Sequence, residues 1–170
     1  NEEQVLRQGR FLHEKHECDA YLEEYIEGRE IYASVLGNNR LSVLPLREMF
    51  FKKVPEDQPR FATFQAKWDE AFRKENGIKN VFPTDLDDSL VREIEQVSRQ
   101  AYRTLGLRGC GRLDMRVTAK HEVFVIEVNP NPNLAPDDEV AQSAQKAGIS
   151  YPQLIQKMLS LALREAEDAA

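Results

Sequence analysis

Two runs of alternating polar and apolar residues lie close together in the chain: GCGRLDMRV at 109–117 and VFVIEVNPNP at 123–132. Alternation with a period of two predicts β-strands, because successive side chains of a strand point to opposite faces. A turn of four residues, 118–121, is predicted to join them, which is an ordinary hairpin length. The two runs are therefore predicted to form a β-hairpin.

The alternation also predicts which side chains share a face of this hairpin. The simplest register pairs Val117 with Glu122 and Asp114 with Val125, so that Glu127 lies diagonal to Asp114 at roughly 7–8 Å. The two predicted faces of the second strand consist of Val123, Val125, Glu127 and Asn129 on one side and Phe124, Ile126 and Val128 on the other.

Oxygen-bearing side chains gather on one predicted face of the hairpin. Asp114, Glu127 and Asn129 offer the carboxylate and amide oxygens that a hard cation such as Mg²⁺ prefers. Arg112, on the same face, suits an anion or a developing negative charge. The same pattern also fits the water-facing side of an ordinary antiparallel hairpin, which is usually polar.

The wording of the two runs, GxGRLDxR followed by a hairpin and EVNPNP, resembles the metal-binding hairpin of the ATP-grasp superfamily, above all its D-alanine–D-alanine ligase-like branch. The resemblance implies ATP and Mg²⁺ (or Mn²⁺) as cofactors. It implies that Asp114, Glu127 and Asn129 bind the metal ions that hold the ATP phosphates. It also implies a catalytic role for Arg112, which would steady the tetrahedral intermediate.

A second segment, LEEYIEGREI at 22–31, resembles the part of this family that holds the base and ribose of ATP. By this resemblance, Glu23 accepts the adenine amino group and Glu30 takes the ribose hydroxyls. The backbone near Tyr25 and Ile26 would then read the edge of the base. Taken alone, the acids of this segment equally fit a solvated charge run.

The long stretch 49–83 contains three prolines and many aromatic residues, and it is predicted to be an ordered loop with one helical part near 66–75. In the relatives, the corresponding loop covers ATP and carries a phosphate-contacting Lys before an aromatic residue. The resemblance places Lys67, followed by Trp68, in that position. The alternative is a solvent-facing Lys beside a buried Trp.

After EVNPNP the sequence departs from the ligase pattern, in which a Gly follows the Pro and a Ser of the next loop binds the substrate carboxylate. This chain has Asn133, Ala135, Asp137 and Asp138 instead. Two acids suit an amine or another cationic part of a substrate. They equally suit the N-terminus of the following helix, where acids are favourable.

Hydrophobic spacing and capping residues predict the remaining elements. The predicted fold class is α+β, an ATP-grasp C-terminal subdomain with helices packed on an antiparallel β-sheet. The predicted helices span about 2–16, 88–105, 138–147 and 151–169, and the further strands span 19–26, 29–36 and 41–46. Residues 1–30 are assigned to the tail of the central subdomain and the nucleotide-binding linker, and residues 31–170 to the C-terminal subdomain.

Composition narrows the function classes. The 170 residues carry a formal net charge of −6, which argues against a nucleic-acid partner. Two distant cysteines and the absence of a long apolar run predict a cytoplasmic protein with no membrane segment. The sequence does not begin with Met, and it contains no glycine-rich phosphate loop. Both observations suggest a part of a longer enzyme, whose relatives are often homodimers.

The predicted activity is therefore ATP- and Mg²⁺-dependent carboxylate–amine ligation through an acyl phosphate, with a small amino acid or carboxylate as substrate. The first alternative is a nucleotide-binding or interaction module without catalysis. The second is a plain scaffold domain, in which Asp114, Glu127 and Asn129 come together by chance.

Overall fold

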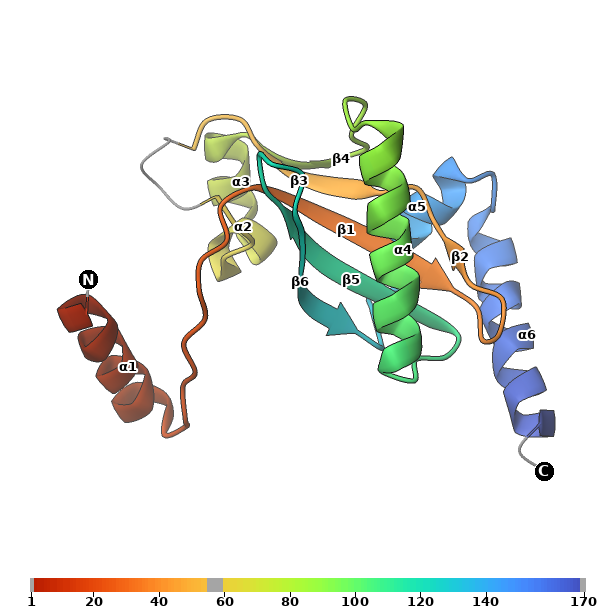
Figure 1. The fold of residues 1–170 in the computed structure, drawn as a ribbon, viewed down its shortest axis with the longest axis horizontal. Coiled ribbons are helices and arrows are strands. Elements are labelled where there is room, and N and C mark those ends of the chain that lie inside the picture. The colour runs from red at the N-terminus through yellow and green to blue at the C-terminus, as the bar shows by residue number, and fades with distance from the viewer. Residues whose placement is uncertain (1, 55–59, 169–170) are drawn as a thin grey trace.

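The computed structural model describes residues 2–54 and 60–168 (Figure 1). Its strands are β1 (Arg29–Leu36), β2 (Ser42–Val43), β3 (Arg47–Phe51), β4 (Ile78–Val81), β5 (Cys110–Val117) and β6 (Val123–Asn129). Its helices are α1 (Glu2–His16), α2 (Phe64–Trp68), α3 (Glu70–Asn76), α4 (Asp88–Thr104), α5 (Glu139–Lys146) and α6 (Tyr151–Asp168).

The strands form one antiparallel sheet with β1 at its centre. The strand order is β4-β3-β1-β5-β6, and the short β2 pairs with the end of β1. Seven of the eight residues of β1 are buried, and both of its faces carry apolar side chains. The strand can therefore lie in the middle of the sheet, where both faces are covered. The predicted α+β class is confirmed.

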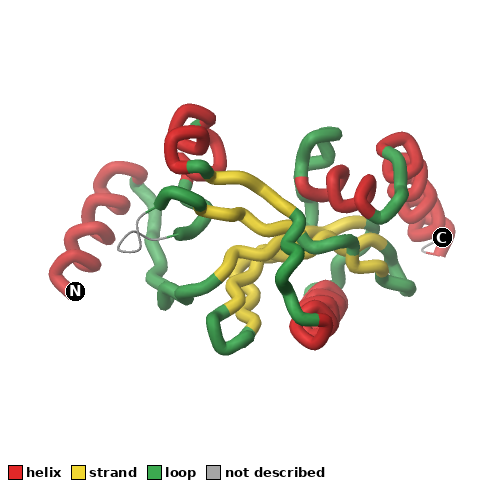
Figure 2. Tube along the Cα trace, turned by 90° about the horizontal axis from the view of Figure 1, so that it is seen from above, coloured by secondary structure: helices red, strands yellow, loops and turns green. Residues whose placement is uncertain are grey.

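Helix α4 covers one face of this sheet, as Figure 2 shows. Its regularly spaced Leu90, Ile94 and Tyr102 are buried, and they pack on the alternate residues of β1 and β5 that point the same way. The predicted helix is confirmed with nearly the expected bounds. Gly106, at φ +67°, follows its C-terminus.

The other face of the sheet is covered in two places. Helices α2 and α3 lie over the β3–β4 side, where Tyr32, Met49 and Ala66 form a small core. Helices α5 and α6 lie at the other end, around Leu36 and Leu154. The polar side chains of β5 and β6 belong to this same face.

Helix α1 stands away from the sheet at the end of an extended segment (Figure 1), and it has no buried residue. The sequence predicted a helix over 2–16, and α1 confirms it. The strand predicted at 19–26 is wrong, because residues 19–27 form neither helix nor strand. Its aromatic and branched residues have no neighbouring strand to pair with, and pairing rather than propensity decides strand formation. Among the described residues, none of the helices combines the length and apolar character needed to cross a bilayer.

Two predictions in the middle of the chain also need correction. The strand expected at 41–46 is reduced to β2, since Pro45 cannot donate to a sheet. The stretch 49–83 was expected to be an ordered loop with one helical part near 66–75. It is helical there, in two short helices, but it also contains most of β3 and all of β4. Strands β3 and β4 are short and contain both charged and apolar residues, so period-two alternation did not reveal them.

Gly28 joins the extended segment to β1, and it lies against the start of the hairpin turn. A Cβ at this position would lie 2.7 Å from the carbonyl carbon of Val117 and closer still to its oxygen. We expect Gly28→Ala to lower the free energy of unfolding by about 1–3 kcal/mol, because backbone must move to admit the methyl group.

Chemical denaturation of Gly28→Ala beside Gly9→Ala tests this prediction. Gly9 lies in α1 with nothing within 4 Å of the added methyl group, and alanine favours a helix. Gly9→Ala should therefore cost no stability. An equal loss in the two variants would contradict the steric explanation.

Candidate functional site: an acidic cleft on the β5–β6 hairpin

The hairpin forms as predicted, but its register differs. Val117 pairs with Val123, and a β-bulge between Asp114 and Met115 brings Asp114 directly opposite Glu127. The predicted pairs Val117–Glu122 and Asp114–Val125 are wrong. The turn is one residue longer than expected, and β6 contains one extra residue that no pairing rule reveals in advance.

The bulge also changes which side chains of β6 share a face. Residue 126 falls between the pairs Met115–Val125 and Asp114–Glu127, so it is the inserted residue. Val123 and Val125 therefore lie opposite core residues of β5, whereas the sequence pattern placed them beside Glu127. Phe124, opposite Arg116, moves to the site face. Glu127 and Asn129 remain on the face that the sequence predicted.

The predicted metal ligands and the predicted catalytic arginine meet on this face. Asp114 is 5% exposed, and its two carboxylate oxygens accept hydrogen bonds from Arg112 Nε at 2.7 Å and from Arg112 Nη2 at 2.9 Å. Glu127 lies directly across the strand pair, and Asn129 lies opposite Arg112. Glu127 is exposed, so one carboxylate of the pair faces the protein and the other faces water.

Burial raises the pKa of Asp114 above its ordinary value, and the charge of Glu127 acts in the same direction. Arg112 and Lys67 oppose this shift. For Arg112, burial alone lowers the pKa, but the hydrogen bond and charge of Asp114 outweigh it and raise the pKa. Burial and the facing Glu127 thus disfavour the charged form of Asp114, and a bound cation would favour it.

A cleft of about 980 Å³ runs over this acidic pair. Asp114 and Glu127 line it together with Phe124. Lys67 of α2 lines the same cleft, as the predicted phosphate clamp requires. The buried tryptophan of the alternative interpretation is wrong, because Trp68 is 69% exposed and Ala66 is the buried residue of that helix.

The segment that resembles the nucleotide-binding part of the family reaches the same cleft. Glu23, Tyr25 and Ile26 line it, although they lie about ninety residues from the hairpin in sequence. Glu30 lines it as well, but it is 7% exposed, and its oxygens accept from Tyr32 Oη at 2.8 Å and from Ala62 N at 2.8 Å. Three segments predicted separately therefore converge on one cavity.

None of the residues 130–138, which follow β6, is among those that line this cleft. Asp138 accepts from the backbone N–H of Glu139 at 2.6 Å and caps α5, which confirms the capping interpretation for this residue. Asp137 is exposed. A substrate role for either residue stays a prediction.

The sequence did not reveal a buried network that holds this loop. Arg47 Nε donates to Glu139 Oε2 at 2.9 Å, and both side chains are at most 10% exposed. Asn80 of β4 donates to the other oxygen of Glu139. Arg47 and Glu139 are 92 residues apart in sequence, so no local pattern connects them.

The donor set fits a divalent cation that also holds an anion. Asp114, Glu127 and Asn129 supply two carboxylates and an amide oxygen, which leaves room for phosphate oxygens around a hard ion. Within the described ranges, no group of three or more His, Cys, Asp or Glu side chains forms a metal site. A site of two acids suits an ion that arrives with its own oxygen ligands.

The facing carboxylates lead to a prediction on stability. Because the pKa of Asp114 is raised in the fold, its stabilising contribution is complete below about pH 4 and is lost as the pH rises through the raised value. We expect Glu127→Gln to stabilise the protein at pH 7.5 by about 0.2–1 kcal/mol, by removing a like charge directly across the strands.

Thermal unfolding at pH 7.5 and at pH 3.5 tests this prediction, with Glu93→Gln on the exposed side of α4 as the control. The gain of Glu127→Gln should disappear at pH 3.5, because the raised pKa of Asp114 leaves this carboxyl protonated there and the like charge across the strands is gone. A loss of stability at pH 7.5 would show that the facing acids do not repel each other.

Comparison with known proteins gives independent results. The family model described as "D-ala D-ala ligase C-terminus" matches residues 6–160. A D-alanine–D-alanine ligase of Carboxydothermus hydrogenoformans is 34% identical over 143 residues, covering 84% of this chain and 42% of the relative. A D-alanine–D-alanine ligase of Moorella thermoacetica is 33% identical over 149 residues, covering 88% of this chain and 45% of the relative.

A solved structure supports the fold. The D-alanine–D-alanine ligase of Bacillus anthracis, crystallised with ATP, matches with a TM-score of 0.75 at 21% identity, over all of this chain and 50% of the ligase. The chain spans less than half the length of the two curated relatives that it matches above. Since the family model covers most of the sequence, the chain belongs to the family of the D-alanine–D-alanine ligase C-terminal domain, within the ATP-grasp fold.

Proposed function

We propose that this chain forms the metal- and nucleotide-binding part of an ATP- and Mg²⁺-dependent ligase that joins a carboxylate to an amine. The observation that carries the proposal is the convergence on one cleft of Asp114 and Glu127, of Lys67, and of Glu23 and Ile26. In a plain scaffold domain, nothing would favour an acidic pair, a lysine and two residues of the extended segment around one cavity.

Each residue has a role that its position supports. Asp114, Glu127 and Asn129 would hold Mg²⁺, which neutralises phosphate charge when it is bound. Lys67 lines the cleft from α2, where it pairs with phosphate oxygens. Arg112, on the same face, stabilises the negative charge that develops on the reacting group.

The reaction needs no nucleophile from the protein. The substrate carboxylate attacks the γ-phosphorus of ATP, forming an acyl phosphate and releasing ADP. The amine then attacks the acyl carbon, loses a proton and expels inorganic phosphate, leaving an amide. The protein contributes position and charge stabilisation, as is usual for phosphoryl transfer.

The substrates are amino acids or related small carboxylates and amines. The loop that in the relatives' pattern binds a carboxylate through a serine carries Asp137 and Asp138 here. Because Asp138 is used as a helix cap, Asp137 is the acid left to meet a cationic group of the substrate. We assign residues 1–30 to the tail of the central subdomain and the nucleotide-binding linker, and residues 31–170 to the C-terminal subdomain.

One observation favours a second candidate, a nucleotide-binding module without catalysis. The chain spans 42% and 45% of the two ligases compared above, so more than half of each of those enzymes is not matched by it. The cleft would then bind a nucleotide without transferring phosphate.

Calorimetric titration with the non-hydrolysable analogue AMP-PNP, with and without Mg²⁺, tests the proposal. Binding that requires Mg²⁺ supports the site, and no binding in either condition contradicts it for this chain. Phosphate release from ATP in the presence of amino-acid mixtures then separates the candidates. Release that depends on an added amino acid supports the ligase, whereas binding without release supports the module.

A further inference from the structure

We propose that Arg116 is the positioning residue that fixes the nucleoside-binding side of the cleft relative to its metal-binding side. This inference rests on the proposed function and deepens it. Arg116 lies on β5, two residues after Asp114 and on the same face of the sheet. It is 4% exposed, and although it is the last residue of the GxGRLDxR pattern, no role was predicted for it from the sequence.

The guanidinium of Arg116 joins three segments of the chain. Its Nε donates to the carbonyl oxygen of Ile26 at 2.9 Å, and Nη1 donates to the carbonyl oxygen of Arg60 at 2.7 Å. Nη1 also reaches Glu30 Oε2 at 3.4 Å, and Nη2 donates to Tyr25 Oη at 3.3 Å. One side chain thus holds the extended segment, the loop before α2, and β1.

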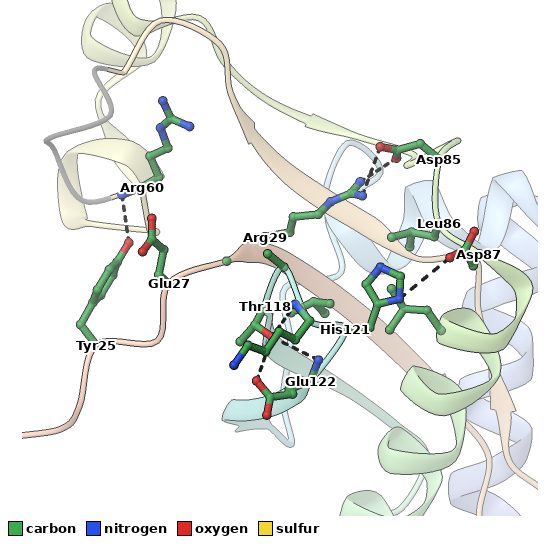
Figure 3. A pocket seen from close by; sticks show the side chains of 15 residues that line it. Tyr25, Glu27, Arg29, Arg60, Asp85, Leu86, Asp87, Thr118, His121 and Glu122 are labelled. Atoms are coloured by element: carbon green, nitrogen blue, oxygen red, sulfur yellow. Dashed lines mark hydrogen bonds and ion pairs between the residues drawn. The ribbon is translucent and has the colours of Figure 1, made fainter.

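The groups that Arg116 holds are also linked to one another. The backbone N–H of Ala62 donates to Glu30, and the backbone N–H of Arg60 donates to Tyr25 Oη at 3.4 Å. Figure 3 shows Tyr25 directed toward Arg60 across the end of the extended segment. The Tyr25 ring also lies under the guanidinium, 5.5 Å from its centre.

These contacts matter because little else positions the extended segment. Residues 19–27 lie outside any helix or strand, so no ladder of sheet hydrogen bonds fixes them. An arginine suits this task because its planar guanidinium offers five donors in a fixed geometry. A lysine at the same position would present a single nitrogen and could not reach all four acceptors.

The consequence is a fixed relation between the two sides of the cleft. Ile26 and Glu30 belong to the predicted nucleoside side, and Asp114 belongs to the metal side. Glu30 already accepts from Tyr32, Ala62 and Arg116, and a carboxylate offers about four lone-pair directions. One direction therefore remains for a ribose hydroxyl, and Arg116 helps to determine where it points.

The test compares Arg116→Gln with the wild-type chain in calorimetric titrations with two probes, AMP-PNP and inorganic tripolyphosphate, both with Mg²⁺. We expect the affinity for AMP-PNP to fall about tenfold, the typical cost of lost charged hydrogen bonds. Affinity for tripolyphosphate, which has no nucleoside, should stay within twofold. Arg99→Gln, which breaks a half-buried ion pair on α4, is the matched control and should change neither.

Hydrogen exchange of the same variants gives a readout that does not depend on binding. In Arg116→Gln, the backbone amides of Arg60 and Ala62, which donate to Tyr25 and Glu30 in the native protein, should exchange faster, while those of β1 and α4 keep their protection. Arg116→Lys should recover little of the lost affinity. If Arg116→Gln does not fold, Tyr25→Phe replaces it, because it removes one acceptor of the guanidinium from a half-exposed ring and should weaken AMP-PNP binding alone.

The outcomes separate the two proposals. A wild-type chain that binds neither probe contradicts the proposed function. A wild-type chain that binds AMP-PNP while Arg116→Gln binds it equally well overturns the role of Arg116 and leaves the proposed function standing. Equal loss of both probes, or full recovery by lysine, would likewise overturn the positioning role, because charge alone would then explain the effect.

Discussion

Asp114→Asn is expected to abolish Mg²⁺-dependent binding of AMP-PNP, with a loss of at least about 100-fold in affinity, while the protein stays folded. Loss of a partner behind a metal ligand already costs about 10–100-fold, and Asp114 is itself the predicted ligand. Folding should survive because the asparagine oxygen can still accept from the Arg112 side chain, which donates to both Asp114 oxygens in the native protein.

The same residue predicts a pH dependence in the wild-type chain. A metal needs the deprotonated carboxylate, and burial raises the pKa of Asp114. Mg²⁺-dependent binding should therefore weaken on acidification at a higher pH than an exposed aspartate would cause. Titrations between pH 7.5 and pH 5 measure this, and Glu93→Gln on α4 serves as the control. If Asp114→Asn binds AMP-PNP with the affinity of the wild-type chain, Asp114 is not a ligand of the metal.

Glu139→Leu is expected to lower the free energy of unfolding by about 3–5 kcal/mol, because it leaves the buried Arg47 without its carboxylate. Arg47 also donates to the carbonyl oxygen of Asn80 at 3.2 Å, and its guanidinium lies 4.4 Å from the ring centre of Phe82. These contacts hold the charge in place but do not neutralise it. The melting temperature should fall by roughly 10 °C for a chain of this size.

The double variant Arg47→Met with Glu139→Leu sharpens this second test. Removing both charges should cost less than removing one, since the remaining desolvated cation causes most of the damage. Glu95→Gln, which breaks the half-buried i,i+4 pair with Arg99 on α4, is the control and should cost at most about 0.5 kcal/mol. A double variant that is less stable than Glu139→Leu would contradict the explanation.

Local patterns were sufficient for much of the fold and the site. Helix α4 could be predicted because Leu90, Ile94 and Leu105 follow helical spacing and Gly106 ends the run. That Asp114 and Glu127 share one face of the hairpin could be predicted, because alternation and motif agree within twenty residues. Each of these features depends on residues close together in sequence.

What the sequence did not reveal depends on contacts between distant segments. The pair of Arg47 and Glu139 and the contacts of Arg116 join residues more than 30 positions apart. Strand β4 is four residues long and gains its stability from β3, so it has no pattern of its own. The strand predicted at 19–26 failed for the same reason, since a strand needs a partner that propensity cannot supply.

The bulge at Ile126 bears on the solubility of the protein. Strand β6 borders the sheet, and its Phe124, Val125 and Ile126 are each more than a third exposed. A regular, apolar border strand is a template on which further chains can add and aggregate, whereas a bulge interrupts and twists that template. Without Ile126, the remaining residues of β6 would alternate perfectly along β5. The extra residue thus opposes edge-to-edge aggregation while Glu127 keeps its place opposite Asp114.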